Sequence, residues 1–436
     1  MTEQKKRLPV TLDTALLLLV FTLSLLYSRY IETNNPTVYA AIHVASFLVL
    51  ITAAGYMIAD FFVKDAAWQH KIKMILLIGL MIFAVVGPLL TAVNLRHNTK
   101  PQDAITDSAV QTEEAVKMVL NGQNPYVMDY FRTPLKAMDA KSPALKHYVY
   151  LPLTFLLPIP FYLLIKSVLG WFDLRLVYLL FYILLIYSLT KITANRVWQR
   201  CLIIVFALNP DVVYYFVYGT NDIVATTCLV LSVLLLAKRR YVWSAVLFSV
   251  ALLTKQFIFL ILPFYLLYLF GQNPSLLRGR DGHLTPLVKV GAVILIMFTI
   301  FALPFALWNF NAFIEDTIRY PYGTSSTSWH IAGWGLSKAA LGTGLIKDQY
   351  DYYPALPFYL LILLPLVAAM FWRQLKRNDI RTMLLAAAIT IFVFVTFSRF
   401  THNNYFYYAT SLLFVSYFGD FPDNPAVEEI PAEAPG

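Results

Sequence analysis

The sequence contains many long runs of apolar residues with almost no charge, and these constrain the fold more than any other feature. About 20 apolar residues, wound into a helix, span the hydrocarbon core of a bilayer. Lipid offers the backbone no hydrogen-bond partners, so a chain crosses it only as helices or as a closed barrel. The runs therefore predict membrane helices. The regular runs cover residues 11–28, 38–63, 74–94, 172–190, 201–218, 223–237, 287–308, 356–372, 383–398 and 405–418, and the less regular ones cover 149–168 and 242–270.

The composition supports this interpretation and argues against other classes of protein. Apolar residues make up 59% of the chain and charged residues 14%, against about half and about a quarter in a typical soluble domain. Disorder is therefore excluded, and a water-soluble enzyme is disfavoured. The net charge is +9, and in so apolar a chain a basic excess indicates cytoplasmic loops before it indicates nucleic acid. We expect the lipid bilayer as a partner and no nucleic acid.

The predicted fold class is an all-α polytopic membrane protein with roughly 11–13 transmembrane helices. A long outer loop carries a surface helix. We expect no soluble domain. The predicted segments are an N-terminal three-helix segment 1–95, a first outer loop 96–148, a membrane core 149–308, a second outer loop 309–355, C-terminal membrane helices 356–418 and an acidic cytoplasmic tail 419–436.

Lysine and arginine residues in short loops predict the orientation in the membrane. A basic cluster at residues 5–7 places the N-terminus in the cytoplasm, and both long polar loops then face outward. The apolar run after this cluster could be mistaken for a signal peptide, but no small-residue cleavage site follows it. We therefore expect a retained first helix and a multi-pass protein of the inner cell membrane.

One conflict appears in this topology. If residues 149–168 and 172–190 both cross the membrane, the basic residues between 191 and 200 fall on the outside. The charge rule places such residues in the cytoplasm. Three prolines lie between residues 152 and 160, and broken helices are tolerated where they line a protein cavity. We therefore expect the 149–168 segment to be short or re-entrant.

The first outer loop contains a predicted amphipathic helix at residues 106–122. Apolar residues recur at helical spacing on one face, and Glu113 and Lys117 lie on the opposite face. Asp107 has two interpretations: a cap that accepts the first backbone N–H groups, or a carboxylate at the mouth of a membrane cavity. Asp103 is either a second acidic group of that cavity or, as we favour, an ordinary solvated loop residue.

Five short motifs, in this order, resemble the GT-C superfamily of polytopic membrane glycosyltransferases. They are Asp107 with the helix that ends in Gly-x-Asn-Pro-Tyr at Tyr126, the Tyr-x-Pro-Leu that begins at Tyr150, the Gly-Thr-Asn-Asp that ends at Asn221 and Asp222, Lys255 with Pro263, and the His-x-x-Tyr that begins at His402. The chain is most similar to the bacterial polyprenyl-phosphate-mannose-dependent branch and to the mannosyltransferases of GPI-anchor synthesis. The resemblance covers roughly residues 100–270 and 395–418.

This resemblance implies a GT-C-like helix bundle and a specific activity. The enzyme would transfer mannose or another hexose from a polyprenyl-phosphate donor to a lipid or glycan acceptor on the outer side of the membrane, by inverting displacement. The outer-loop aspartate is the proposed general base of the family, so Asp107 inherits that role. The GPI enzymes carry an Asp-x-Asp in this loop, and this chain has none. We therefore predict no specific cofactor. A divalent metal remains an alternative, but no Asp-x-Asp motif supports it.

Three cationic side chains are candidates for binding the lipid phosphate of the donor. Polyprenyl phosphate is the leaving group, and a cation stabilises the negative charge that develops on it. Lys255, Arg399 and His402 suit this task. The alternative for Lys255 is a lysine that extends to the membrane interface, and a lone histidine such as His402 is as often structural.

Further substrate contacts are expected from polar residues close to the apolar runs. Asn221 and Asp222 begin a predicted helix, so each is either its cap or, because charges at membrane depth usually line functional cavities, a substrate-binding group. Tyr126 and Tyr150 join this set through the motifs that contain them, and Asp103 joins it as the weaker acid of its loop.

The second outer loop is the predicted acceptor site. Arg319, Trp329 and His330 lie in it, and aromatic faces stack on sugar rings while polar neighbours fix the orientation. The alternative is an aromatic belt at the membrane interface. The Gly-, Ser- and Thr-rich stretch 323–328 is predicted to be a mobile lid or acceptor loop.

Two other functions remain as alternatives. A transporter or flippase should show paired intramembrane charges on repeat-related broken helices, and the sequence shows no such pair. Another transferase or ligase that uses polyprenyl lipids should carry a His-rich or Arg-rich helix pair, which is also missing. No Rossmann fingerprint for a nucleotide sugar occurs, and this favours a lipid-linked donor.

Overall fold

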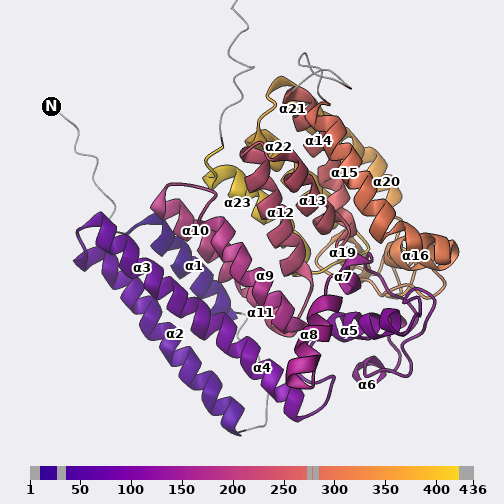
Figure 1. Cartoon of the computed structure of the whole chain (residues 1–436), viewed down its shortest axis with the longest axis horizontal. Coiled ribbons are helices and arrows are strands. Elements are labelled where there is room, and N and C mark those ends of the chain that lie inside the picture. The colour runs from indigo at the N-terminus through magenta and orange to yellow at the C-terminus, as the bar shows by residue number, and fades with distance from the viewer. Residues whose placement is uncertain (1–9, 27–35, 273–276, 278–283, 422–436) are drawn as a thin grey trace, which may run out of the picture. The chain divides into compact units, whose positions relative to one another are not determined.

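The computed structural model describes residues 10–26, 36–272, 277 and 284–421 (Figure 1). The basic cluster at residues 5–7 and most of the predicted acidic tail lie outside these residues. Helices dominate, and the strands of the described part are two residues long, so the predicted all-α class is confirmed. The chain forms two compact units. Unit 1 comprises Met1–Lys146 and Thr154–Thr227, and unit 2 comprises His147–Leu153 and Cys228–Gly436.

Unit 1 is a helical bundle in which long N-terminal helices precede shorter ones. Within it α2 packs along α3, and α1 packs on α10. The helices are α1 (Leu12–Leu26), α2 (Pro36–Phe62), α3 (Ala66–Met81), α4 (Gly87–Asn98), α5 (Asp107–Leu120), α6 (Leu135–Met138), α8 (Ile159–Leu169), α9 (Leu174–Leu189), α10 (Arg196–Ala207) and α11 (Pro210–Tyr218). The helices α7 (Leu153–Leu156) and α12 (Asp222–Ala237) run across the unit boundaries.

Unit 2 contains the remaining helices and both strands. Its last two helices, α22 and α23, pack on each other, and α13 packs on α15. The elements are α13 (Tyr241–Leu252), η3 (Gln256–Ile261), α14 (Leu262–Gln272), α15 (Pro286–Phe301), α16 (Leu303–Trp308), α17 (Phe310–Ile314), η4 (Glu315–Arg319), α18 (Tyr320–Tyr322), β1 (Ala332–Gly333), α19 (Leu336–Gly342), α20 (Leu356–Phe358), η5 (Tyr359–Leu363), α21 (Leu364–Lys376), α22 (Ile380–Thr396), β2 (Phe400–Thr401) and α23 (Asn403–Phe418).

Prolines explain where three long helices change their winding. The π-helical turns η1 (Ile82–Val86), η4 and η5 each end one residue before a helix whose first turn contains a proline: Pro88, Pro321 and Pro365. Proline lacks a backbone N–H, and its ring clashes with the carbonyl four residues earlier. A π turn relieves this conflict locally and lets the helix continue.

Few of the described helices are long enough to cross a bilayer unaided. Three spans meet the requirement for length and apolar composition: residues 43–62, 66–98 and 356–376. Others, such as α12 and α22, have 16 and 17 residues, or about 25 Å at the rise of an α-helix. That length falls a little short of the roughly 30 Å hydrocarbon core. The predicted count of 11–13 spanning helices therefore stays a prediction.

The segment for which the sequence predicts an incomplete crossing is broken in the structure. The helices of Leu153–Leu169 meet α9 at an angle of 117° across a short break. With 11 residues, α8 is only about 16 Å long. A second pair, α10 and α11, bends by 50° at Asn209-Pro210. This geometry fits a re-entrant or broken segment between residues 149 and 190.

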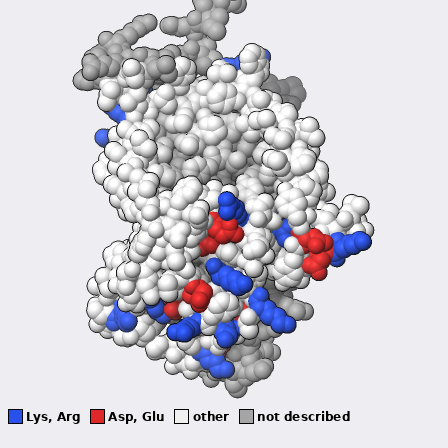
Figure 2. All heavy atoms as spheres, turned by 90° about the vertical axis from the view of Figure 1, so that its right-hand side faces the viewer, with Lys and Arg blue, Asp and Glu red and all other residues white. Residues whose placement is uncertain are grey.

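Apolar side chains cover much of the surface, as expected of helices that face lipid. Examples from several helices are Phe47, Leu164, Leu295 and Leu361, whose exposed fractions range from 61% to 77%. Figure 2 shows one face of the molecule, where charged side chains gather in one part and a broad area carries none. In water so large an apolar surface would drive association, whereas in a bilayer it is solvated by lipid.

Candidate active site

The candidate base Asp107 is the first residue of α5, but it does not cap the helix. Thr106 is the cap: its backbone is extended, and its hydroxyl accepts the N–H of Ala109 at 3.3 Å. The Asp107 carboxylate instead accepts the N–H of Ser108 at 2.7 Å. The predicted cap is thus wrong by one residue, because threonine and aspartate are both favoured N-cap residues and stand next to each other here.

The environment of Asp107 raises the pKa of its carboxyl group. Burial is the largest cause, and the Asp139 carboxylate adds repulsion, while the Ser108 N–H opposes the shift. A general base works best when its pKa lies close to the working pH. A half-buried aspartate with a raised pKa meets that requirement better than an exposed one. Asp103, in the preceding turn, is also half-buried.

The helix α5 is buried on more faces than the amphipathic pattern predicts. Glu113, predicted to lie on the polar face, is 4% exposed. Its carboxylate accepts hydrogen bonds from both terminal nitrogens of Arg96, at 2.9 and 2.7 Å, and from the backbone N–H of Leu174 at 2.8 Å. Lys117 is more exposed and pairs with Glu114. The correction has a simple cause: a carboxylate is stable inside a protein when cations and N–H groups satisfy it.

The turn that contains Asn221 and Asp222 packs against the start of α5. The Thr106 N–H donates to the carbonyl of Tyr218 at 2.8 Å. Gly219, at φ +91°, comes so close that a Cβ there would lie 3.2 Å from Ala109. Asp222 is the first residue of α12, and both it and Asn221 are 5% exposed. Among the described residues the Asn221 amide has no hydrogen-bond partner. Unit 1 therefore brings Asp107, Asn221 and Asp222 into one region.

Lys255 occupies a break between helices in unit 2. Its backbone is extended between α13 and η3, and its side chain is buried, with the residue 4% exposed. The ammonium group lies 5.2 Å from the ring centre of Tyr150 and 5.6 Å from that of Tyr405. Such contacts favour a cation in a desolvated site. The interpretation of Lys255 as a side chain that extends to the interface is therefore disfavoured.

The same part of unit 2 includes Tyr150 and His402. The side chain of Gln256 donates to the carbonyl of Val149, which holds the segment with Tyr150 beside Lys255. His402 precedes α23, and its ring meets the ring of Tyr405 edge-on at 6.0 Å. Tyr405 thus lies between Lys255 and His402. Tyr126, by contrast, belongs to unit 1, where it is 3% exposed and packs edge-on against Phe155.

Arg399 holds the second outer loop. Its guanidinium donates to four backbone carbonyls: Trp329 at 2.9 Å, Asp351 at 2.6 Å, Tyr350 at 3.1 Å and Gln349 at 3.4 Å. These bonds use all three nitrogen atoms of the Arg399 guanidinium. The geometry therefore favours a loop anchor over a ligand for the lipid phosphate.

A second contact fixes the predicted acceptor loop. His147 Nδ1 lies 2.7 Å from an Asp316 oxygen, His147 Nε2 lies 2.6 Å from the hydroxyl of Thr327, and the Tyr148 N–H donates to Asp316 at 2.8 Å. Burial raises the pKa of Asp316, although His147 and Tyr148 both oppose the shift. The stretch 323–328, predicted to be a mobile lid, is thus attached at Thr327.

The acceptor-loop residues lie in different surroundings. Trp329 stacks on His330 at 4.9 Å, and both are half-buried. The Arg319 side chain is 55% exposed and pairs with Glu315 at 3.4 Å. Trp329 and His330 form a stacked aromatic pair, and aromatic faces are the kind of surface that sugar rings contact.

No group of three or more histidine, cysteine, aspartate or glutamate residues that could hold a metal ion occurs in the described part of the chain. The two cysteines, Cys201 and Cys228, are both free and buried.

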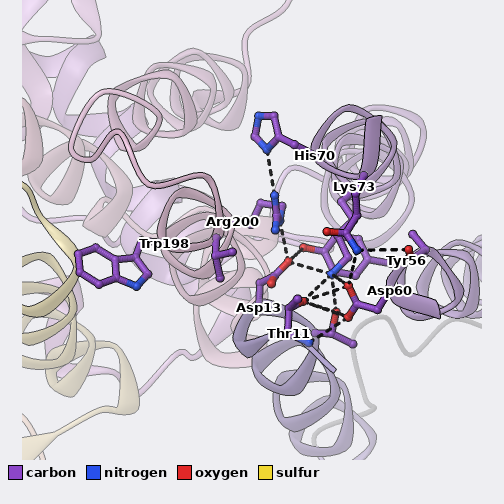
Figure 3. Close-up of polar contacts among 12 residues, drawn as sticks. Thr11, Asp13, Tyr56, Asp60, His70, Lys73, Trp198 and Arg200 are labelled. Carbon is purple, nitrogen blue, oxygen red and sulfur yellow. Dashed lines mark hydrogen bonds and ion pairs between the residues drawn. The ribbon is translucent and has the colours of Figure 1, made fainter. Parts of the chain in front are cut away.

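Unit 1 also holds a buried ionic cluster that the sequence does not reveal (Figure 3). Asp13 accepts hydrogen bonds from Arg200 at 2.6 Å, Tyr56 at 2.6 Å and Lys73 at 3.2 Å. Lys73 also pairs with Asp60. The cluster joins α1, α2, α3 and α10 through two positive and two negative side chains, and all four are buried. The available signal was weak: Asp13 and Asp60 each lie inside an apolar run, and Lys73 and Arg200 each directly precede one.

Comparison with known proteins supplies the family. A search of curated proteins finds no match. The profile of glycosyltransferase family 87 matches residues 148–398, which is more than half of the chain. The match includes Tyr150, Asn221, Asp222 and Lys255 but ends before His402 and begins after Asp107. The chain therefore belongs to glycosyltransferase family 87, whose members are polytopic membrane glycosyltransferases of the GT-C type.

Proposed function

We propose that the protein transfers a hexose, with mannose as the first candidate, from a polyprenyl-phosphate donor to a glycolipid or glycan acceptor. The reaction takes place on the outer side of the inner cell membrane, and the N-terminus lies in the cytoplasm. The main support is Asp107: a half-buried carboxylate with a raised pKa, at the start of α5 and beside the Asn221–Asp222 turn. The glycosyltransferase family supports the transfer reaction.

The proposed reaction is a single displacement at the anomeric carbon. The acceptor hydroxyl attacks that carbon while its proton passes to the Asp107 carboxylate. The bond from the anomeric carbon to the phosphate oxygen breaks, and polyprenyl phosphate leaves with the electron pair. A base that accepts a proton during attack typically accelerates such a step by about 10²–10⁴-fold. One displacement inverts the configuration of the sugar.

Lys255 is the proposed partner of the phosphate. It is a buried cation between two aromatic rings, and a preorganised cation in a desolvated site stabilises developing negative charge more strongly than water does. His402, next to Tyr405, is the proposed second donor to the phosphate. Trp329 and His330 are proposed to contact the acceptor.

The test uses Asp107→Asn in proteoliposomes with labelled polyprenyl-phosphate sugars. We expect kcat to fall by about 10²–10⁴-fold with unchanged thermal stability, because Thr106, not Asp107, caps α5. The matched control is Asp129→Asn, which removes an exposed carboxylate from the same loop. Full transfer by Asp107→Asn would show that Asp107 is not the base.

A further inference from the structure

Arg175 is a fully buried arginine that neither the family motifs nor the hydrophobic pattern single out. It lies in the first turn of α9 and is 0% exposed. Asp173, the cap of α9, neutralises it through two parallel hydrogen bonds, Nε to one carboxylate oxygen at 2.8 Å and Nη2 to the other at 2.7 Å. An arginine paired in this way is tolerated inside a protein, because the carboxylate and its hydrogen bonds offset the loss of hydration.

The remaining N–H groups of Arg175 reach backbone carbonyls that are far apart in sequence, in the turn before α5 and in the last turn of α11, and Nη2 also donates to the carbonyl of Ala92 at 3.4 Å. Nη1 donates to the carbonyl of Ala104 at 2.5 Å and to that of Val217 at 3.2 Å. Ala104 lies three residues before Asp107, and Val217 precedes the turn that leads to Asn221. One guanidinium group therefore binds the backbone on both sides of the candidate site in unit 1.

The backbone at both contact points is constrained. Ala104 has a φ of +51°, a left-handed conformation that is strained for a residue with a Cβ. Such a conformation persists only where the surroundings fix it. On the other side, a Cβ at Gly219 would lie 3.0 Å from Cγ of Arg175. The turn therefore approaches the arginine closely enough to require glycine.

A second ionic contact fixes Arg175 to α5. Its partner Asp173 also accepts from Arg96 at 3.0 Å, and Arg96 binds Glu113 of α5. The helix that begins with Asp107 is thus connected to the arginine through its entry, at Ala104, and through its middle, at Glu113.

We infer that Arg175 is a positioning residue for the transfer reaction. It holds the Ala104–Asp107 segment and the Tyr218–Asp222 turn at a fixed separation, so that the Asp107 carboxylate faces the acceptor hydroxyl in one geometry. Only a planar fork with several N–H groups reaches Asp173, Ala104 and Val217 together, and the single ammonium of a lysine does not. This inference rests on the proposed function of Asp107.

The test compares Arg175→Lys with Arg200→Lys in the reconstituted full-length protein. Both changes replace a buried, carboxylate-paired arginine of unit 1, and Arg200 belongs to the separate cluster of Figure 3. We expect Arg175→Lys to lower kcat by about 10²-fold, the effect of displacing a catalytic group by roughly 1 Å, with little change in the KM for the donor. Arg200→Lys should lower the melting temperature to a similar degree and leave kcat unchanged.

A second pair of variants covers the case in which Arg175→Lys fails to fold. Gly219→Ala places a methyl group against Arg175 and against Ala109 of α5 without removing the charge of the arginine, and we expect the same selective loss of kcat. Gly122→Ala is the control, because Gly122 also has a positive φ, +71°, but nothing lies within 4 Å of its added Cβ. The inference predicts a kcat defect in Gly219→Ala that Gly122→Ala does not share.

The outcomes separate this inference from the proposed function. If Asp107→Asn is inactive while Arg175→Lys and Gly219→Ala keep full kcat, Arg175 is only a structural ion pair and the inference is wrong. If Asp107→Asn transfers sugar normally, the proposed base is wrong, whatever Arg175 does. Equal kcat losses in Arg175→Lys and Arg200→Lys would also overturn the positioning role.

Discussion

At the scale of single residues, the sequence predicts the position of Asp107 well and its neighbours poorly. The periodic helix that follows it and the adjacent motif were enough to predict where α5 begins. The cap was misplaced by one residue because Thr106 and Asp107 both have oxygens that accept a backbone N–H. Arg175 could not be predicted, since its carbonyl partners lie 71 and 42 residues away and carry no side-chain signal.

The raised pKa of Asp107 predicts a distinct pH dependence. The base works only when it is deprotonated, so kcat/KM should rise with pH through the raised pKa and level off above it. The Asp139 carboxylate contributes to that shift, so Asp139→Asn should move the acid limb to lower pH. The measurement is initial transfer rate against pH in proteoliposomes. An acid limb near pH 4, where an unperturbed aspartate titrates, would contradict the role of burial.

At the scale of elements, prolines in the sequence predict the broken segment after residue 149 but not the π turns. A proline indicates that a helix changes there, whereas the choice between a break and a π turn depends on packing. The buried cluster of Asp13, Lys73 and Arg200 was missed for a related reason. Each charge alone is typical of a membrane interface, and only the packing of α1, α3 and α10 brings them together.

The ionic cluster predicts an asymmetric response to mutation. Asp13→Leu leaves the Arg200 guanidinium without its buried carboxylate, and loss of one partner of such a pair costs about 3–5 kcal/mol. The double variant Asp13→Leu/Arg200→Met should be more stable than either single variant. Thermal unfolding in detergent measures this. A double variant less stable than both singles would show that the charges stabilise the helices beyond neutralising each other.

The pairing of β1 with β2 predicts a sharp requirement for glycine. The strands pair in parallel, Ala332 with Phe400 and Gly333 with Thr401. Gly333 has a φ of +85°, and a Cβ there would lie 1.8 Å from the carbonyl oxygen of Thr401. Gly333→Ala should therefore separate the strands and speed proteolysis of the second outer loop.

Gly342→Ala is the matched control for that variant. Gly342 lies in the helix α19, and nothing is within 4 Å of its added Cβ. Alanine is the better helix former by about 0.5–1 kcal/mol, so this variant should be as stable as the parent or slightly more so. Equal protease sensitivity of the two variants would contradict the requirement at Gly333.

At the scale of the whole molecule, the apolar runs were sufficient to predict a polytopic helical membrane protein. They did not predict the division into two units. His147–Leu153 folds with the C-terminal unit although its neighbours on both sides fold with the other. The reason is specific contact: Asp316 and Gln256 bind this segment, and such partners leave no periodic signal in the sequence.

The predicted orientation gives a labelling pattern for the intact protein. Both native cysteines are buried, so they should react slowly with a membrane-impermeant maleimide. Lys347 and Lys191 are exposed, and we expect Lys347→Cys to be labelled from the outside of intact cells and Lys191→Cys only after permeabilisation. Labelling of Lys191→Cys in intact cells would show that residues 149–168 and residues 172–190 both cross the membrane.

The buried cluster of Figure 3 also has a consequence for biosynthesis. Asp13 enters the membrane with the first helix, but Lys73 follows 60 residues later and Arg200 follows 187 residues later. At about 5–20 residues per second, the ribosome needs roughly 10–40 s to deliver Arg200 after Asp13. Because an uncompensated charge is costly in lipid, the early helices must wait in a hydrated or chaperoned state until α10 is inserted. Assembly of the unit is therefore completed late, by a helix that follows residues 96–148 in the chain.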